Sequence, residues 1–340
     1  MANQPPKWLS QLLGWYAMTV LGLGARTGLL DALLAAPGTA AEIAERAGVD
    51  ERNALQWLWA MASAGHVSLE GDCFALTDET RFVFGPGFPV NARAVVDFVD
   101  RTSSVLPEIA DAMQSGKGVA PNRFHAAYGD SIGRINTPTY AMALVDEWIG
   151  SCEGLVTTLA AGGRIADLAS GNGDAAVIMA KAFPSASITA YDLDSHQIEA
   201  TRARASAEGL GGLTAEAAGA EQLGREAFDL VTCLDSFHHF GDPAAVAAQV
   251  RGALAPGGVF LLAESAMSGD LGTDVQNPFS VVVHSAGLLY CLQENLSSGG
   301  PGLTGGDGPG WVNEALERAG FTSISTLDSP TGYRVFVART

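Results

Sequence analysis

The chain has 340 residues, of which 47% are hydrophobic and 16% charged, and its formal net charge is −18. This length suits two domains, and the composition excludes a chain that is disordered throughout. Because so acidic a protein is repelled by phosphate groups, neither nucleic acid nor a membrane is expected as a partner.

The N-terminal region predicts buried helices. The first residues lack the basic-then-apolar order of a secretion signal, so a cytoplasmic enzyme is expected. The apolar stretch from Leu12 to Ala35 is interrupted by Arg26 and Asp31, which favours packed helices over a membrane span. Four widely spaced cysteines contain no CxxC pair and are expected to be reduced thiols, so no metal site is predicted. They are Cys73, Cys152, Cys233 and Cys291.

Residues 39–76 have the pattern of a winged helix. Thr39 is expected to cap a helix over 40–47 with Glu42 as its capping-box partner, and Asp50 to cap a second helix over 51–64. Two short strands around a glycine turn follow. The second helix carries Arg52 but no Lys, whereas DNA recognition requires several cationic donors. Residues 1–90 are therefore predicted to form a domain for packing or dimerisation.

The middle of the chain predicts helices around a substrate pocket. A linker is expected at 85–90, followed by mainly helical residues 91–160 with breaks at 116–121 and near Gly129. This stretch is rich in aromatic residues, and its candidate substrate contacts are Tyr140, Asp146 and Trp148. For any single one of them, packing between helices is the favoured explanation.

From residue 164, apolar runs alternate with helical stretches, as in a parallel sheet with right-handed crossovers. The tail predicts a helix over 311–319 and two strands, 322–327 and 333–338, joined by a short turn. The predicted fold class is therefore α/β, a Rossmann-like doubly wound sheet with a C-terminal antiparallel hairpin. This domain would span 91–340 and follow the winged helix.

A nucleoside site is predicted after the first strand. Gly171 and Gly173 allow close backbone approach, and Asp192, about 20 residues further on, can accept both ribose hydroxyls. A dinucleotide-binding site has the same glycine turn and the same acid at the next strand end. However, Asp167 at the strand end would repel a pyrophosphate and suits the cationic amino group and sulfonium of S-adenosylmethionine. The residues therefore favour S-adenosylmethionine over NAD.

The motifs together resemble class I S-adenosylmethionine-dependent methyltransferases. Within that class the chain is similar to the two-domain group with an N-terminal winged-helix dimerisation domain, which includes small-molecule O-methyltransferases. The resemblance covers almost the whole chain. Its motifs lie at 167–173 (DLASGNG), 191–194 (YDLD), 228–231 (FDLV), 237–242 (FHHFGD) and 254–258 (LAPGG).

The resemblance implies a set of cofactor contacts. Asp167 would meet the methionine amino group, Asp192 the ribose, and Leu193 the adenine, while Asp235 would form the floor of the methionine pocket. The backbone cradle would comprise Ala169, Gly171 and Gly173. Two positions depart from the family pattern. Ala169 replaces a glycine, and the acid near the adenine amino group is replaced by Gly219 and Ala220, which leaves that contact to the backbone or to Glu221.

The resemblance also implies that His238 is the general base. The family has a His-Asp-Trp-x-Asp segment where this chain has residues 238–242 (HHFGD). The alternative roles for His238 are a cap on the next helix and packing under the cofactor, and His284 is a second candidate base. Glu264 either orients His238 or faces solvent. A glutamate of the plant enzymes has no counterpart at 299–304 (GGPGLT).

The sequence therefore predicts a homodimeric methyltransferase that acts on a small molecule, with O-methylation in secondary metabolism as the expected reaction. Oxygen, nitrogen and carbon acceptors all stay open. The alternative is a protein of the same fold that binds S-adenosylmethionine without methylating, as a regulator or a cyclisation catalyst. The predicted dimer surface comprises Trp8, Leu9, Leu12, Leu13 and Trp15.

Overall fold

The computed structural model describes residues 6–85, 88, 90–128 and 131–340, and the chain divides into two compact units. One unit comprises Met1–Ser103 with Arg134–Pro138, and the other comprises Ser104–Gly133 with Thr139–Thr340. The first unit extends past the predicted boundary at residue 90 because helix α6 (Ala92–Thr102) packs on helix α1 (Lys7–Thr27). Arg26 of α1 pairs with Asp100 of α6 at 2.7 Å. Residues 86, 87 and 89 of the predicted linker lie outside the described residues.

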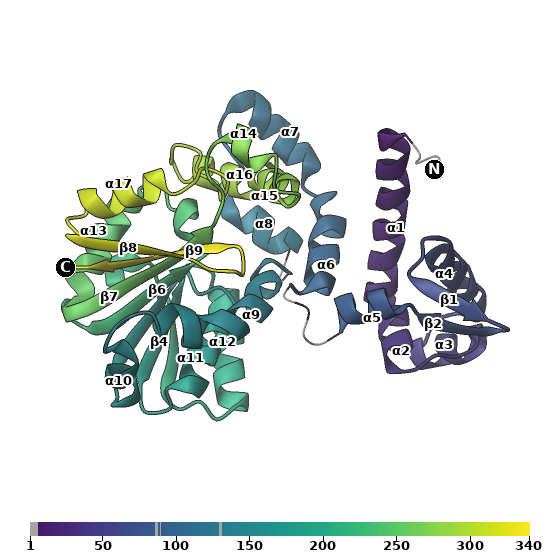
Figure 1. Ribbon diagram of the computed structural model, residues 1–340, viewed down its shortest axis with the longest axis horizontal. Helices are drawn as coiled ribbons and strands as arrows, with labels where there is room; N and C mark the ends of the chain where they lie inside the picture. The colour runs from purple at the N-terminus through teal and green to yellow at the C-terminus, as the bar shows by residue number, and fades with distance from the viewer. Residues whose placement is uncertain (1–5, 86–87, 89, 129–130) are drawn as a thin grey trace. The chain divides into compact units, whose positions relative to one another are not determined.

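The first unit is a winged helix between two further helices (Figure 1). Its other elements are α2 (Leu29–Ala35), α3 (Ala40–Ala47), α4 (Glu51–Ser63), β1 (Val67–Glu70), β2 (Cys73–Leu76) and α5 (Asp78–Phe84). The predicted capping box of Thr39 and Glu42 is present. Trp57 of α4 is buried against α1, and its Nε1 donates to the carbonyl of Val20 at 2.7 Å. A Cβ atom at Gly24 would lie 2.2 Å from the Trp57 ring, so this glycine permits the contact.

Helix α1 differs from the expectation of a buried helix. Leu21 near its C-terminal end is buried, but Leu12 and Leu13 are exposed because no described residue of the unit covers the first half of the helix. The helix ends at Gly28, whose φ of 81° is left-handed.

No single described helix is long and apolar enough to cross a membrane. Helices α1 and α2 reach that length and apolar character only when taken together, as a pair bent by 77°.

The second unit contains a seven-stranded sheet in the order β5-β4-β3-β6-β7-β9-β8. Strands β3 to β7 are parallel, and β9 is antiparallel to both β7 and β8. The predicted doubly wound sheet with a C-terminal antiparallel hairpin is therefore confirmed. The strands are β3 (Arg164–Leu168), β4 (Ser187–Asp192), β5 (Leu213–Ala217), β6 (Phe228–Leu234), β7 (Leu254–Ser265), β8 (Ser323–Asp328) and β9 (Tyr333–Arg339).

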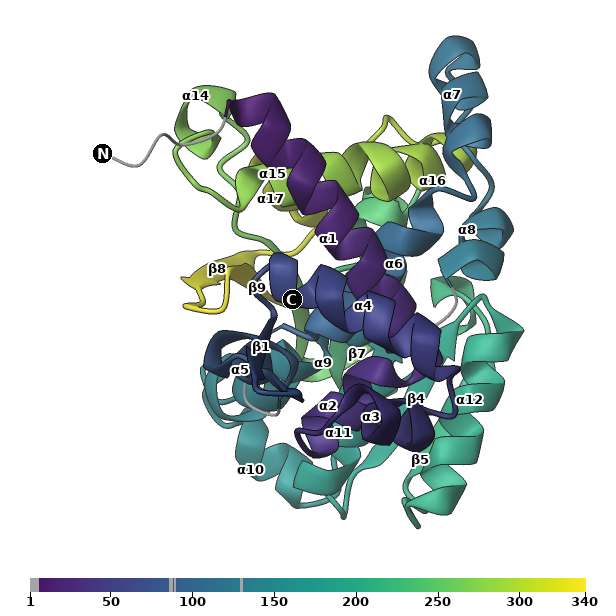
Figure 2. The same ribbon diagram turned by 90° about the vertical axis from the view of Figure 1, so that its right-hand side faces the viewer.

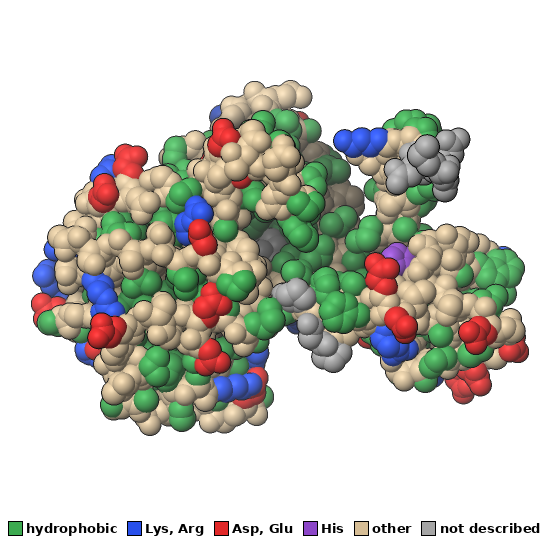
Figure 3. Space-filling view, in the orientation of Figure 1, with side chains coloured by type: hydrophobic (Ala, Val, Ile, Leu, Met, Phe, Trp, Pro, Cys, Tyr) green, Lys and Arg blue, Asp and Glu red, His purple; other side chains and the backbone are tan. Residues whose placement is uncertain are grey.

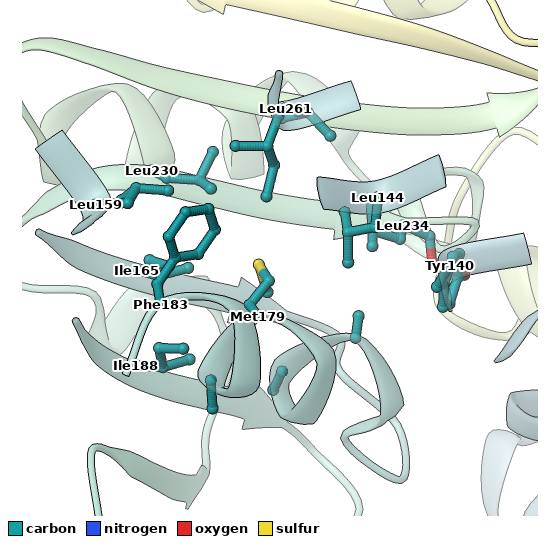
Figure 4. Close-up of a cluster of buried hydrophobic side chains, with 14 of the residues drawn as sticks. Tyr140, Leu144, Leu159, Ile165, Met179, Phe183, Ile188, Leu230, Leu234 and Leu261 are labelled. Carbon is teal, nitrogen blue, oxygen red and sulfur yellow. Dashed lines mark hydrogen bonds between the residues drawn. The ribbon is translucent and has the colours of Figure 1, made fainter. Parts of the chain in front are cut away.

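Helices cover both faces of this sheet. One face packs on α10 (Leu155–Ala160), α11 (Asp174–Ala182) and α12 (Ser195–Ala207), and the other on α13 (Pro243–Ala253) and α17 (Gly310–Arg318). Figure 4 shows the first of these cores, where Met179 of α11 and Phe183, just after this helix, meet Ile165, Ile188 and Leu230 of three neighbouring strands. The interior strands are thus buried on both sides, as parallel sheets require.

A group of helices lies beyond the carboxyl ends of the strands. It comprises α7 (Leu106–Ser115), α8 (Pro121–Tyr128), α9 (Ser131–Ala143), α14 (Leu271–Asp274), α15 (Ser280–Ala286) and α16 (Leu292–Ser297). Figures 1 and 2 both show α8 beside α16. Two π-helical turns, Leu144–Ile149 and Gly287–Cys291, interrupt the group, and such turns are frequent at functional sites. The predicted break near Gly129 lies outside the described residues.

Candidate active site

The glycine turn follows β3 where the sheet order reverses direction, which is the place where open α/β sheets bind ligands. Asp167 near the end of β3 is buried. Its Oδ1 accepts a hydrogen bond of 2.7 Å from Thr232, whereas its Oδ2 has no hydrogen-bond partner among the described residues. Burial raises the pKa of Asp167 to about 7, Thr232 opposes this rise, and the nearby Asp192 adds to it. This carboxylate therefore favours a cationic partner.

The turn itself exposes its backbone. Ala169 and Gly171 have left-handed φ angles of 54° and 53°, and a Cβ atom at Gly171 would meet no atom within 4 Å. Gly173 is also left-handed, and a side chain there would collide with Thr201 at 2.5 Å. Ala169 thus occupies a conformation that glycine adopts more readily, which explains why the family pattern has glycine at this place.

Asp192 and Leu193 stand at the end of β4. The Asp192 Oδ2 accepts from the Gly171 amide at 2.8 Å, and its Oδ1 accepts from the Asp194 amide at 2.9 Å. These bonds fix the carboxylate beside the turn. Leu193 is 77% exposed, so its side chain is available to cover an apolar ring.

The positions expected near adenine and methionine lie at two other strand ends. After β5, the Gly219 amide donates to Glu221 Oε1 at 3.2 Å, while Ala220 is buried. A Cβ atom at Gly219 would lie 2.4 Å from the Glu221 carboxylate. Glu221 therefore fills the space that an acidic side chain at position 219 would take. After β6, Asp235 has a left-handed φ of 53°, and its Oδ2 accepts from the Tyr333 hydroxyl at 3.1 Å.

These features fit S-adenosylmethionine. The unpartnered Asp167 Oδ2 suits the amino group, the fixed Asp192 carboxylate suits the ribose hydroxyls, and the exposed Leu193 suits the adenine. The Ser170 hydroxyl, also buried and without a partner among the described residues, adds a polar group to the turn.

His238 and Glu264 form a buried pair at the ends of β6 and β7. The distance between His238 Nδ1 and Glu264 Oε2 is 2.6 Å, and Glu264 Oε1 accepts from the Phe237 amide at 2.8 Å. Glu264 therefore orients His238 and does not face solvent. His238 does not cap helix α13, because the Asp242 side chain accepts from the Ala245 amide there. Oxygen or nitrogen atoms of Asp235, His238 and Glu264 lie within 4.8 Å of one another.

A second histidine and a cysteine join this pair. His239 Nδ1 lies 2.6 Å from Glu294 Oε2, and the rings of His238 and His239 are tilted with centroids 4.3 Å apart. Cys291 ends the second π-helical turn and lies against both histidines. Of the four cysteines, all free, Cys152 and Cys233 are buried, whereas Cys291 is half-buried.

The charges of this cluster are coupled. Burial lowers the pKa of His238, but the Glu264 carboxylate and Cys291 outweigh it and hold that pKa well above its ordinary value. Burial raises the pKa of the Cys291 thiol, but His238 and His239 outweigh it and lower the pKa to about 7. The cluster therefore shifts His238 toward its protonated form and leaves the Cys291 thiol partly ionised near neutral pH.

The candidate substrate residues occupy different surroundings. Tyr140 and Trp148 are buried beneath the end of β6, where the Tyr140 hydroxyl donates to the Leu234 carbonyl at 3.4 Å (Figure 4). The Trp148 Nε1 donates to Ser329 at 3.2 Å. Asp146 and His284 are exposed. Their contact with a substrate stays a prediction.

Sequence reasoning missed Cys291, Glu294 and Asn295. Asn295 is fully buried, and its Nδ2 donates to the carbonyls of His238 and Phe240, both at 2.9 Å. The available signal was the spacing of Cys291 and Glu294, three residues apart, which places both on one side of a helix. Nothing in the spacing relates that helix to His238, more than fifty residues earlier in the chain.

Comparisons with known proteins agree with this fold. Residues 166–260 match the methyltransferase-domain family, and residues 16–77 match the Rv2258c-like winged helix-turn-helix domain. The chain carries a methyltransferase domain. The predicted enzyme class and the predicted winged helix before it are therefore confirmed. The search of curated protein sequences found no match.

Several solved structures share the fold over the whole chain. An O-methyltransferase family protein from Burkholderia thailandensis is 22% identical, with 97% of this chain and 96% of that one covered and a TM-score of 0.68. Human N-acetylserotonin methyltransferase, solved with S-adenosylmethionine, is 18% identical, with 100% and 99% covered and a TM-score of 0.67. An O-methyltransferase from neocarzinostatin biosynthesis is 20% identical, with 99% of each chain covered and a TM-score of 0.61.

Proposed function

We propose that the methyltransferase domain transfers the methyl group of S-adenosylmethionine to a hydroxyl group of a small molecule, with His238 as the general base. The strongest support for this proposal is the buried His238–Glu264 pair, whose Nδ1 and Oε2 atoms are 2.6 Å apart. The pair lies at the strand ends together with Asp235. A histidine held by a carboxylate next to a cofactor site is a recurrent arrangement for proton removal.

The cofactor would be held by charge and shape. When bound, S-adenosylmethionine supplies an electrophilic methyl group on its sulfonium. Asp167 would bind the amino group through Oδ2, Asp192 the ribose hydroxyls, and Leu193 would cover the adenine. Structures of two similar proteins, the human and the neocarzinostatin enzymes, contain this cofactor, which supports the assignment.

The proton would move to Nε2 of His238. With Nδ1 hydrogen-bonded to Glu264, Nε2 is the ring nitrogen able to accept the hydroxyl proton of the acceptor, and Glu264 would stabilise the resulting imidazolium. A phenol has a pKa of about 10, so removal of its proton makes it a better nucleophile at neutral pH. Such a base contributes roughly 10² to 10⁴ in rate.

An aromatic acceptor in secondary metabolism is the substrate class we favour. Phe124, Tyr128 and Tyr290 form an aromatic group with ring centroids 5.0 to 5.9 Å apart, and Tyr290 also lies 4.9 Å from His239. The neocarzinostatin enzyme was solved with 2-hydroxy-5-methyl naphthoic acid, which supports a planar phenolic acceptor. Tyr140, Asp146, Trp148 and His284 remain candidate contacts.

Transfer of a labelled methyl group tests the proposal. The full chain is incubated with methyl-labelled S-adenosylmethionine and a panel of phenols, naphthols and aromatic amines, and both labelled product and S-adenosylhomocysteine are measured. We expect matched product and S-adenosylhomocysteine with at least one phenol, and neither with Asp192→Ala, which loses the ribose carboxylate. Tight cofactor binding without transfer to any member would contradict methylation and favour a regulator or a cyclisation catalyst.

One observation favours that second function. The Glu264 carboxylate and Cys291 hold the pKa of His238 well above its ordinary value, and the ring paired with Glu264 can donate a proton as well as accept one. An acid beside a bound sulfonium cofactor suits a catalyst that protonates its substrate. Conversion of a substrate without formation of S-adenosylhomocysteine would establish this alternative.

We further propose a cytoplasmic homodimer. Trp8, Leu13 and Trp15 of α1 are 65%, 55% and 59% exposed, and Figure 3 shows hydrophobic side chains at the N-terminal end of this helix. Contiguous exposed aromatic and leucine side chains are typical of an interface. A second copy of the chain is the partner we propose, and sedimentation measures it directly.

A further inference from the structure

We propose that His238, His239 and Cys291 form a binding site for a divalent transition metal, with Zn²⁺ as the ion that it fits best. One nitrogen of each ring and the Cys291 sulfur all lie within 4.8 Å of one another. Two imidazoles and a thiolate are the donors that Zn²⁺ and Co²⁺ prefer, whereas Mg²⁺ and Ca²⁺ prefer oxygen. The sequence predicted no metal site, because the cysteines were widely spaced and no motif connects Cys291 with the histidines.

Each histidine is held as a metal ligand is held. Glu264 lies 2.6 Å from Nδ1 of His238, and Glu294 lies 2.6 Å from Nδ1 of His239. In metal sites the second ring nitrogen commonly contacts a carboxylate in this way, which fixes the ring and makes the other nitrogen a stronger donor. Glu264 engages Nδ1 of His238, so Nε2 is its ligand atom, and His239 offers one ring nitrogen within 4.8 Å of the other ligand atoms.

The His238 Nε2 atom supports the site independently. His238 is 2% exposed, and its Nε2 is buried with no hydrogen-bond partner among the residues that the structure describes. A buried polar atom without a partner is costly, and a bound ion would satisfy it. The Cys291 thiol loses its proton when a metal binds, and the two neighbouring glutamates balance the charge of the ion.

The site is partly exposed and has an open position. His239 and Cys291 are half-buried, so two of the three ligands have solvent-accessible surface. Three protein ligands leave the fourth position of a tetrahedral ion for water or another small ligand, as in catalytic zinc sites.

Metal binding and methyl transfer would exclude each other, a consequence that rests on the proposed function. The ion would occupy the lone pair of His238 Nε2 that accepts the proton of the acceptor. The site would therefore act as an inhibitory switch that responds to free Zn²⁺.

Cobalt titration of the reduced, metal-free full chain tests the site. We expect one equivalent of Co²⁺ to produce a thiolate-to-cobalt charge-transfer band in the near ultraviolet and tetrahedral bands in the visible, and Zn²⁺ to displace it. Cys291→Ser should lose the charge-transfer band, and Glu294→Gln should weaken affinity about 10- to 100-fold. The control Cys73→Ser, on a strand of the winged helix, should bind like the wild type.

Two outcomes would overturn the site: no charge-transfer band in the wild type, or an unchanged band in Cys291→Ser. The binding test does not depend on methylation, so a failure of the proposed function leaves it intact. If methyl transfer is found, Zn²⁺ should inhibit it, with an inhibition constant at least about tenfold higher in Cys291→Ser. Equal inhibition of both proteins would contradict the switch.

Discussion

His238 and Glu264 determine how activity should depend on pH. The base form of His238 is the neutral ring, and the Glu264 carboxylate and Cys291 hold its pKa well above the ordinary value against the effect of burial. The fraction of neutral His238 therefore grows as pH rises through this raised pKa, and methyl transfer should increase with it.

Glu264→Gln tests this dependence. Removal of the carboxylate charge lowers the pKa of His238, so the rise of kcat/KM with pH should move to lower pH. The plateau should fall by roughly 10² or more, because the imidazolium loses its partner. A pH profile of initial rates measures both effects. Glu317→Gln, an exposed change on α17, should match the wild type, and an unshifted profile in Glu264→Gln would remove Glu264 from the mechanism.

Asp167 should couple cofactor binding to the release of a proton. Burial raises the pKa of this carboxyl to about 7, and the cofactor's amino group favours the ionised form. Binding of S-adenosylhomocysteine, which carries the same amino group, should release most of a proton at about pH 6, and its affinity should rise toward about pH 8. Calorimetry in buffers of different ionisation enthalpy measures the release.

The matched variants are Asp167→Asn and the exposed Asp111→Asn on α7. The first should abolish the proton release and weaken binding about tenfold at the higher pH, because a charge-assisted hydrogen bond is lost. The second should change neither. The same release in Asp167→Asn would assign the proton to another group.

At the scale of elements, Asn295 connects the His238 turn with the glycine-rich segment. Its Nδ2 donates to two carbonyls of residues 238–240, and its Oδ1 accepts from the amides of Gly302 and Leu303 at 2.7 and 3.1 Å. Helix α16 thereby fixes both the base and the neighbouring segment.

Asn295→Leu should lower the free energy of unfolding by about 3 kcal/mol, since it leaves several buried backbone groups without partners. It should also reduce kcat, because the His238 turn loses its support. Urea unfolding measures the first effect and initial rates the second. Asn122→Leu on α8, an exposed position, serves as the control, and equal stability of the two variants would contradict the role of Asn295.

The elements differ in how far the sequence predicts them. The capping box at Thr39 and the helix over 40–47 that follows it are local features, so spacing and caps were sufficient. The cofactor turn was also predictable, because its residues lie on one strand–turn–helix segment. The His238, Cys291 and Glu294 cluster was not, because it joins two segments that only tertiary packing brings together. The π-helical turn that presents Cys291 has no sequence signature either.

At the scale of the whole molecule, the alternation of strands and helices predicted the sheet, whereas the burial of α1 was predicted only in part. The sequence indicated both packed helices and a dimer surface here, because periodicity does not distinguish a core face from an interface face. The structure leaves them exposed within the single chain. The extension of the first unit to Ser103 likewise depends on the pair of Arg26 and Asp100, which only the packing of α6 creates.

The exposed face of α1 should determine the oligomeric state. The double variant Leu13→Glu and Trp15→Glu should convert the dimer to a monomer. Each charged side chain replaces an apolar one whose burial in the dimer interface would contribute roughly 1.5–3 kcal/mol. Sedimentation velocity over a concentration series measures this. Leu69→Glu, at an exposed leucine of the hairpin, should stay dimeric. A wild-type monomer at every concentration would contradict the proposed dimer.

The central claim is that His238 removes the proton in a methyl transfer from S-adenosylmethionine. Its most direct test is the rate of labelled methyl transfer by wild type and His238→Gln, with both proteins saturated with cofactor and their affinities for S-adenosylhomocysteine measured in parallel. The account predicts equal affinity and a kcat roughly 10² to 10⁴ lower in the variant. Equal affinity with unchanged kcat would show that the proton leaves by another route and would contradict the account.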